Sequence, residues 1–362
     1  MRILYGVVGE GMGHATRSRV VLDHLVSRHD VEIVVSGRAH GFLTKAFPSH
    51  KVHAIAGLNM IYEDNEVRKG KTALDFLKKL PAFAENHERF TSLAQDFRPE
   101  LVISDFETFS YLYGKAHDLP IISIDNMQII NRCALDVDIP PDLEASFLTA
   151  KTLVKAKLAR AAAYLITTFF YPPVRKPHTA LFPPILRDKV LAAKRSDGAH
   201  VLVYQTSDSF TALIPTLQTL SARFIVYGLN RKEQLGNVEL RTFSEDGFIE
   251  DLASCRAVIA GGGFSLMGEA VYLGKPMLTV PLVGQFEQTL NALYLQKLGY
   301  GEYHRELDAA AIQTFLGRAP DYSRALGAHR QDGNSAIFAA LDELIGRVAE
   351  TGRVLPAGSK MR

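Results

Sequence analysis

The sequence has few cysteines, no long hydrophobic run and almost no excess of charge. Cys133 and Cys255 are the only cysteines among 362 residues and form no Cys-x-x-Cys, so neither a zinc site nor a disulfide framework is expected. No apolar stretch reaches the roughly 18 residues of a membrane-spanning helix. The formal net charge of +2 argues against a dedicated nucleic-acid-binding domain, which needs a basic face. These absences predict a globular protein with neither a metal site nor a nucleic-acid partner.

Composition and length agree with this. The chain is 47% hydrophobic and 22% charged, which is typical of a globular protein, and its length allows two domains of ordinary size. Residues 1–8 form an apolar run without a charged-then-apolar leader. We therefore expect no signal peptide and a cytoplasmic protein.

Strand-like and helical patterns alternate along the whole chain. Short apolar runs separated by helical spacing are typical of βαβ units, which build a parallel sheet covered on both faces. Prolines concentrate in residues 171–187, which predicts a stiff interdomain linker. The pattern therefore predicts an α/β protein of two Rossmann-like domains, residues 1–170 and 188–333, followed by a last helix and a frayed tail over residues 334–362.

The most informative stretch begins at residue 258. Residues 258–260 read as a buried strand, Gly261, Gly262 and Gly263 follow, and a helical pattern begins at Phe264. A strand that ends in glycines at a helix N-terminus directs several backbone N–H groups and a partial positive charge at one point, which suits a diphosphate. Glu269 lies about two turns into this helix, within reach of sugar hydroxyls.

A second polar cluster follows the next apolar strand. Pro281 opens a loop that carries Gln285, Glu287, Gln288 and Asn291. These side chains offer closely spaced donors and acceptors, which suit a hydroxylated ligand.

Taken together, residues 263–291 resemble the donor-binding signature of nucleotide-sugar glycosyltransferases with the two-Rossmann-domain (GT-B) fold. The pattern is similar to that of the UDP-glycosyltransferases and of MurG. The resemblance implies two domains that face each other across a cleft, with the last helix crossing back to the first domain. It also implies inverting, metal-independent transfer of a hexose from a nucleotide-sugar, with UDP as the favoured carrier and no cofactor.

The resemblance also assigns donor contacts. Arg187 and Ser207 would contact the diphosphate, the segment around Phe248 would read uracil, and Glu269 would hold the ribose. Gly261 stands where the plant enzymes have a phosphate-binding His, so phosphate binding would depend more on backbone N–H groups and Arg187. The full set of implied donor-binding residues is Gly11, Gly13, Arg17, Arg187, Ser207, Phe248, Ile249, Gly262, Gly263, Phe264, Ser265, Glu269, Gln285, Glu287 and Gln288.

The first loop, with Gly9, Gly11 and Gly13 before His14, invites a dinucleotide interpretation. The third glycine comes one residue too early for the Rossmann fingerprint, although Arg38 after the second strand leaves NADP open. The loop is more similar to that of the glycosyltransferases, in which the following His is the catalytic base. A His at a helix start stays neutral more readily, because the dipole disfavours the imidazolium. The alternative is a His that caps the turn.

Two further residues of this half leave alternatives open. Asp105 ends an apolar strand, as does the Asp that orients the catalytic His in the plant-type enzymes, whereas MurG-type enzymes lack it. Asp105 is therefore either the partner of His14 or the N-cap of the next helix. Arg17, one turn after His14, either faces the phosphates or is solvated.

Two weaker signals concern other partners. Asp136 and Asp138 form a DxD, the metal-binding mark of another glycosyltransferase fold, but the two-domain pattern does not fit that fold. Lysines recur on the apolar helix predicted over residues 147–163, at Lys151, Lys155 and Lys157. Such a helix either contacts the inner face of an anionic membrane that carries a lipid-linked acceptor, or covers the core with a solvated face.

The sequence therefore predicts an inverting glycosyltransferase of cell-envelope or glycoconjugate biosynthesis, with His14 and Asp105 as catalytic residues. Two alternatives remain: a UDP-sugar 2-epimerase of the same fold, or a non-catalytic nucleotide-sugar-binding subunit. Residues 57–72 and 126–146 are candidate acceptor loops, but they contain no pattern that identifies the acceptor.

Overall fold

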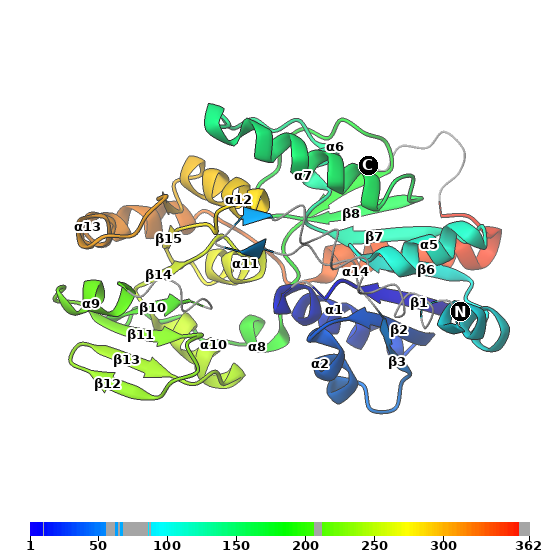
Figure 1. Cartoon of the computed structure of the whole chain (residues 1–362), viewed down its shortest axis with the longest axis horizontal. Helices are drawn as coiled ribbons and strands as arrows, with labels where there is room; N and C mark the ends of the chain where they lie inside the picture. The colour runs from blue at the N-terminus through cyan, green and yellow to red at the C-terminus, as the bar shows by residue number, and fades with distance from the viewer. Residues whose placement is uncertain are drawn as a thin grey trace. The chain divides into compact units, whose positions relative to one another are not determined.

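The computed structural model describes residues 1–9, 11–55, 62–63, 66–67, 86, 88–205 and 212–354. The chain divides into two compact units. The first comprises Met1–Ile185 and the C-terminal segment from Gly333, and the second is Leu186–Asp332. Figure 1 labels most of the helices and strands of both units. In the part of the chain described, no helix has the length and apolarity needed to cross a membrane.

The first unit is built on a seven-stranded parallel sheet with the order β3-β2-β1-β6-β7-β8-β9. Its strands are β1 (Arg2–Val7), β2 (Asp30–Ser36), β3 (Val52–Ile55), β6 (Leu101–Asp105), β7 (Ile121–Asp125), β8 (Ala163–Thr167) and β9 (Thr179–Phe182). Its helices are α1 (Met12–Val26), α2 (Ala39–Ala46), α5 (Thr108–Ala116), α6 (Ile129–Arg132), α7 (Glu144–Lys157) and α14 (Ser335–Thr351), with short helices at Leu93–Phe97 and Pro141–Leu143. The small strands β4 (Tyr62–Glu63) and β5 (Glu66–Val67) pair with each other.

The central strands of this sheet are buried continuously. The central strands β6 and β7 are buried along their whole length, as expected of strands covered by helices on both faces. Helix α14 joins this core although it is far away in sequence. It buries Ile337, Leu341 and Leu344 on one helical stripe against the strands and helices of the first unit.

One feature of this unit differs from expectation. The prolines predict an extended linker over residues 171–187, but strand β9 lies within that range and pairs with β8 in parallel. The reason is local, because Thr179–Phe182 is a proline-free run of four residues with a β-branched threonine and a phenylalanine. Its backbone N–H groups can therefore donate hydrogen bonds to β8 at the edge of the sheet.

The second unit contains another seven-stranded sheet, with the order β12-β13-β11-β10-β14-β15-β16, in which only the β12–β13 pair is antiparallel. Its strands are β10 (His200–Tyr204), β11 (Arg223–Tyr227), β12 (Glu233–Leu235), β13 (Val238–Arg241), β14 (Ala257–Ala260), β15 (Met277–Thr279) and β16 (Gly301–Tyr303). Its helices are α8 (Asp188–Leu191), α9 (Leu213–Gln218), α10 (Glu245–Ser254), α11 (Phe264–Tyr272), α12 (Phe286–Lys297) and α13 (Ala309–Leu326).

The strand orders confirm the predicted α/β class with two mainly parallel sheets. They also locate the candidate binding edges. In the first sheet the chain runs outward from β1 through β2 and then returns to β6 on the other side of β1. In the second sheet β11 and β14 lie on opposite sides of β10. Open α/β sheets bind ligands at the carboxyl ends of strands at such reversals. The edges to examine are therefore those of β1 with β6 and of β10 with β14.

Candidate functional site

The first edge carries a histidine–aspartate pair. Gly11, with a left-handed φ of 84°, turns the chain from β1 into α1, so that His14 lies in the first turn of the helix. Asp105 is the last residue of β6. His14 Nδ1 lies 2.8 Å from Asp105 Oδ1, and the carboxylate is fully buried. The structure therefore joins two residues that are 91 positions apart in the chain.

The competing role for Asp105 is wrong. Helix α5 is capped by Glu107, whose carboxylate oxygens accept from the backbone N–H groups of Phe109 and Ser110 at 2.6 Å each. Asp105 instead accepts from Ser18 Oγ at 2.8 Å in addition to its contact with His14. The N-cap signal in the sequence belongs to the acidic residue two positions later.

Arg17 completes this cluster. Its guanidinium is buried, with 4% of the residue exposed, and Nε donates to Asp105 Oδ2 at 3.1 Å while Nη1 donates to Asn126 Oδ1 at 2.9 Å. The solvated alternative for Arg17 is therefore wrong. The alternative of a phosphate contact also loses its basis, because the guanidinium faces Asp105 and Asn126.

The charges of this cluster determine its chemistry. Burial by itself raises the pKa of Asp105, but the opposite charge of Arg17 and the contact with His14 outweigh it and lower the pKa to about 2. An ionised Asp105 can only accept, so it favours the His14 tautomer with the proton on Nδ1. Arg17 Nη2 lies equally close to Nδ1 and can only donate, which by itself favours the opposite tautomer. Nη2 has a closer acceptor in Asp105 Oδ1, at 2.5 Å, so we assign the Nδ1 proton to the bond with the carboxylate. Nε2 then carries the lone pair that can take a proton.

The second edge carries the glycine turn between β14 and α11. Gly263 is the N-cap of α11, and no side chain caps the helix there. A Cβ added to Gly262 would lie 2.2 Å from the backbone oxygen of Gln288, whereas a Cβ on Gly263 would meet nothing within 4 Å. Gly262 is thus required for packing against α12, and Gly263 leaves open space before the first turn of α11, which begins with Phe264 and Ser265.

This contrast gives a paired prediction. Gly262→Ala should destabilise the protein by about 1–3 kcal/mol, because its methyl group overlaps the α12 backbone. Gly263→Ala should leave the stability nearly unchanged but weaken the binding of a phosphorylated ligand. Urea unfolding and ligand titration of both variants test this. Equal stability of the two variants would contradict the assigned packing.

Two residues expected at different parts of a ligand contact each other. Glu269 on α11 is buried, and its two carboxylate oxygens accept from Arg187 Nε at 2.7 Å and Nη2 at 2.8 Å. Arg187 Nη1 donates to Glu245 Oε1 on α10 at 3.0 Å. Arg187, which was expected to bind the diphosphate, therefore forms a two-point ion pair with Glu269, which was expected to bind the ribose.

The polar residues of α12 meet at the same edge. Asn291 Nδ2 donates to the carbonyl oxygen of Gly262 at 3.0 Å and to Glu287 Oε1 at 2.8 Å. Gln288 Oε1 accepts from the backbone N–H of Leu282 at 3.1 Å, and its Nε2 donates to Gln285 at 2.5 Å. These bonds hold the N-terminal turn of α12 against the glycine turn, so the predicted cluster does assemble around it.

The segment expected to read a base is largely buried. Phe248 and Ile249 are 4% exposed each, and the ring of Phe248 packs against Tyr204 and Tyr227. Phe243, which was not among the predicted site residues, is 54% exposed, and its ring lies 5.6 Å from that of Phe248. Its only sequence signal is an aromatic residue just after a strand, at the binding edge of the sheet. Ser207 lies outside the described residues.

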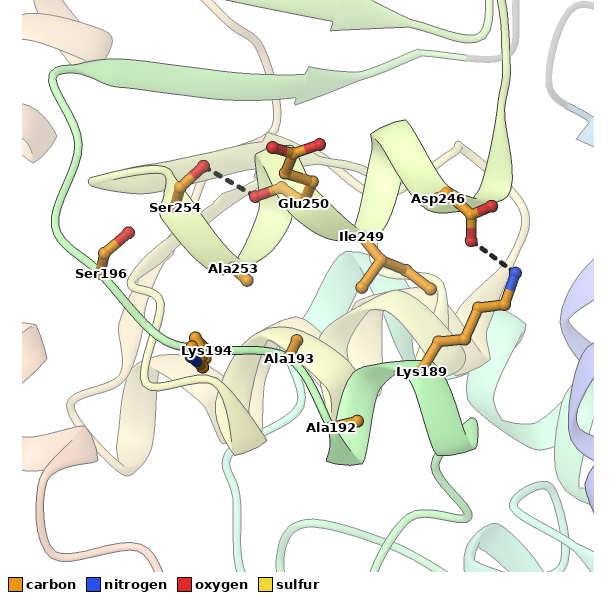
Figure 2. Close-up of a pocket in the computed structure, with 10 residues that line it drawn as sticks. All are labelled: Lys189, Ala192, Ala193, Lys194, Ser196, Asp246, Ile249, Glu250, Ala253 and Ser254. Carbon is orange, nitrogen blue, oxygen red and sulfur yellow. Dashed lines mark hydrogen bonds and ion pairs between the residues drawn. The ribbon is translucent and has the colours of Figure 1, made fainter.

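A hollow in the described part of the second unit lies elsewhere. It has a volume of about 570 Å³, opens widely to solvent and runs between α8 with the following segment and α10 (Figure 2). Of the predicted site residues it contains only Ile249, and the ion pair of Lys189 with Asp246 lies at one end of it. The hollow is lined by Lys189, Ala192, Ala193, Lys194, Ser196, Asp246, Ile249, Glu250, Ala253 and Ser254. It does not coincide with the glycine turn.

The described parts of the chain contain no group of three or more His, Cys, Asp or Glu side chains arranged to hold a metal ion. Asp105 and Glu269, the buried acids at the two edges, have arginine partners.

Comparisons with known proteins match the chain to one family. The model of glycosyl transferase family 1 matches residues 1–320. An uncharacterized glycosyltransferase of Methanosarcina mazei is 25% identical over 357 residues, covering 83% of this chain and 85% of its own length. One from Methanosarcina acetivorans is 23% identical with the same coverage.

Solved structures show the same fold. The chain is similar to LpCGTa in complex with UDP (TM-score 0.67, 14% identity, 96% of this chain and 99% of that chain). It is also similar to the spinosyn forosaminyltransferase SpnP (TM-score 0.65, 15% identity, 96% and 99%). A third is UGT2 of Phytolacca americana with UDP-2-fluoro-glucose and pterostilbene (TM-score 0.65, 14% identity, 94% and 98%).

Proposed function

The chain belongs to glycosyl transferase family 1 and is a glycosyltransferase with the GT-B fold, and from this premise we propose that it moves a sugar from a UDP-sugar to an acceptor hydroxyl with inversion. The observation that carries the proposal is the contact of His14 with the buried Asp105. A binding subunit needs no such pair. The epimerase alternative is not favoured, because the similar proteins named above are glycosyltransferases.

The proposed reaction is a single displacement. His14 Nε2 takes the proton of the acceptor hydroxyl as its oxygen bonds to the anomeric carbon, while the bond from that carbon to the diphosphate oxygen breaks. Asp105 stabilises the imidazolium that forms. The proton later passes to solvent. Gly11 and Gly13 are proposed to keep the start of α1 open to the reactants. One attack from the face opposite the leaving group gives inversion.

The donor is proposed to bind at the glycine turn of the second unit. Backbone N–H groups from Gly262 to Ser265 and the N-terminal end of the α11 dipole would take up the charge of the leaving diphosphate, so that no metal ion is required. Glu269 would accept from ribose hydroxyls, and Glu287 with Gln288 would contact the transferred sugar. The exposed ring of Phe243 offers a face on which a base can stack. Similar structures that contain UDP or a UDP-sugar support this donor class.

A thermal-shift panel of UDP, GDP, TDP and NADP tests the donor assignment. UDP should raise the melting temperature, because a ligand that binds only the folded state stabilises it by mass action. Glu269→Ala should abolish the shift. Glu250→Ala removes a carboxylate from the exposed face of α10 and should retain it. A shift with NADP alone would instead favour the dinucleotide interpretation of the first loop.

We also propose that the protein contacts a membrane peripherally and that its acceptor is lipid-linked. Helix α7 buries only Val154, while Leu148 and Leu153 are 60% and 41% exposed. Lys151 and Lys155 follow Leu148 at i+3 and i+7 and share its side of the helix, whereas Leu153 lies on another side. An exposed leucine beside two lysines suits the surface of an anionic bilayer.

The protein should therefore sediment with vesicles that contain phosphatidylglycerol more than with neutral ones, and less at high salt. Replacing Lys151 and Lys155 by glutamate should remove this preference. Equal binding to both kinds of vesicle would contradict it, and the lysines would then only keep a helix face solvated.

A further inference from the structure

In the second unit, one partly buried arginine connects two helices of the proposed donor site. Arg187 immediately precedes α8 and donates from Nε and Nη2 to both carboxylate oxygens of Glu269 on α11. Its third nitrogen, Nη1, donates to Glu245 in the first turn of α10. The side chains of Arg187 and Glu269 are 13% and 6% exposed. The guanidinium therefore joins the helix that follows the glycine turn to the helix that follows Phe243.

This contact fixes the orientation of the Glu269 carboxylate. A two-point arginine–carboxylate contact defines both the position and the plane of the acid, which a single-point contact does not. Burial by itself lowers the pKa of Arg187, but the hydrogen bonds and charges of Glu269 and Glu245 raise it above its usual value, so the guanidinium stays charged. Each carboxylate oxygen of Glu269 accepts one hydrogen bond from Arg187 and has a second lone pair that can accept from another donor.

We propose that Arg187 is a positioning residue, which holds Glu269 ready to accept from the hydroxyls of the donor ribose, and that it does not bind the diphosphate. The proposal rests on the proposed function of the same site. Three of the five N–H donors of Arg187 bind the two carboxylates, and a diphosphate that drew the guanidinium toward itself would break these bonds. Two carboxylates would then stand without their guanidinium near a ligand of the same charge, which is unfavourable.

The two roles differ in which part of the nucleotide they affect. Affinities of UDP, 2′-deoxy-UDP and uridine separate them: the ratio of UDP to 2′-deoxy-UDP reports ribose recognition, and the ratio of UDP to uridine reports the phosphates. In the wild type, a hydroxyl bound to a charged acceptor should favour UDP over 2′-deoxy-UDP about 10- to 100-fold. Arg187→Lys keeps the charge but loses the two-point contact, so most of this preference should disappear. The ratio of UDP to uridine should stay near its wild-type value.

Two variants serve as references. Glu269→Gln should lose the ribose preference to the same extent as Arg187→Lys. Lys189→Met removes a half-exposed cation that pairs with Glu245 and Asp246 but does not contact Glu269, and it should retain the wild-type preference. If Arg187→Lys does not fold, the double variant Arg187→Gln with Glu269→Gln removes both charges together. Its ribose preference should equal that of Glu269→Gln alone.

The inference is overturned if Arg187→Lys keeps the ribose preference, or if it loses the UDP-to-uridine ratio instead, which would make Arg187 a diphosphate ligand. It is also overturned if the wild type binds UDP and 2′-deoxy-UDP equally well, and the proposed donor site then still stands. If the wild type binds GDP rather than UDP, the uridine assignment fails. The same comparison with GDP, 2′-deoxy-GDP and guanosine then decides the role of Arg187.

Discussion

Replacing His14 by alanine should lower the rate of sugar transfer by about 10²–10⁴-fold, the usual contribution of a positioned general base. The affinity for the nucleotide should be unchanged, because the proposed donor contacts of the second unit remain intact. The physical reason is the bond of Nδ1 to the buried, ionised Asp105, which leaves Nε2 to take the acceptor proton. The initial rate of UDP release in the presence of acceptor and the dissociation constant of UDP measure the two effects.

The same helix supplies a matched control. His24 on α1 also contacts an aspartate, with Nε2 lying 2.7 Å from Asp342 Oδ1, but it lies in the last turn, away from the carboxyl edge of the sheet. His24→Ala should retain most of the transfer rate. If His14→Ala transfers sugar as fast as His24→Ala, His14 is a capping residue and the assigned base is wrong.

The second large effect concerns stability. Arg17→Met should destabilise the protein by about 3–5 kcal/mol, because it leaves the fully buried Asp105 without its guanidinium partner. The midpoint of urea unfolding, followed by circular dichroism, measures the loss. Arg19→Met is the control on the same helix, since the Arg19 side chain is 42% exposed and pairs with Asp23 at i,i+4. Its effect should stay within about 0.5 kcal/mol.

The same pair predicts how stability depends on pH. The folded-state pKa of Asp105 is depressed from 3.8 to about 2. A depressed carboxyl stabilises the folded state above its unfolded pKa, and this contribution is lost as the pH falls through the folded pKa. Wild type should therefore lose about 2 kcal/mol from this group between about pH 5 and pH 2. In Arg17→Met this part of the acid sensitivity should shrink, and an unchanged pH profile would contradict the assigned pairing.

The fold was predictable from the sequence because its signals are local. Buried parallel strands such as β6 and β14 are continuous apolar runs, and the glycines after β14 mark a strand–helix turn in any context. Strand β9 was missed because the prolines around it are a stronger local signal than its four residues. The resemblance to the glycosyltransferases could be detected for the same reason, because it depends on the spacing of residues within a short stretch.

Contacts between distant residues were predictable only where the resemblance suggested them, as for His14 with Asp105. Arg187 and Glu269 are 82 positions apart, and nothing in either local pattern indicates that they pair. Residue type suggested a role for each separately, a phosphate ligand and a ribose ligand. The N-cap of α5 shows the same limit at short range, since Asp105 and Glu107 both suit the role and only the backbone path decides between them.

A crystal structure of the protein with UDP tests the central claim most directly. The account predicts that the diphosphate oxygens accept from the backbone N–H groups of Gly262 to Ser265 and that the ribose hydroxyls donate to Glu269, with Arg187 still on the carboxylate. A nucleotide bound in the hollow beside α10, or at the glycines before α1, would contradict it. The glycine turn after β14 would then serve only to pack α12.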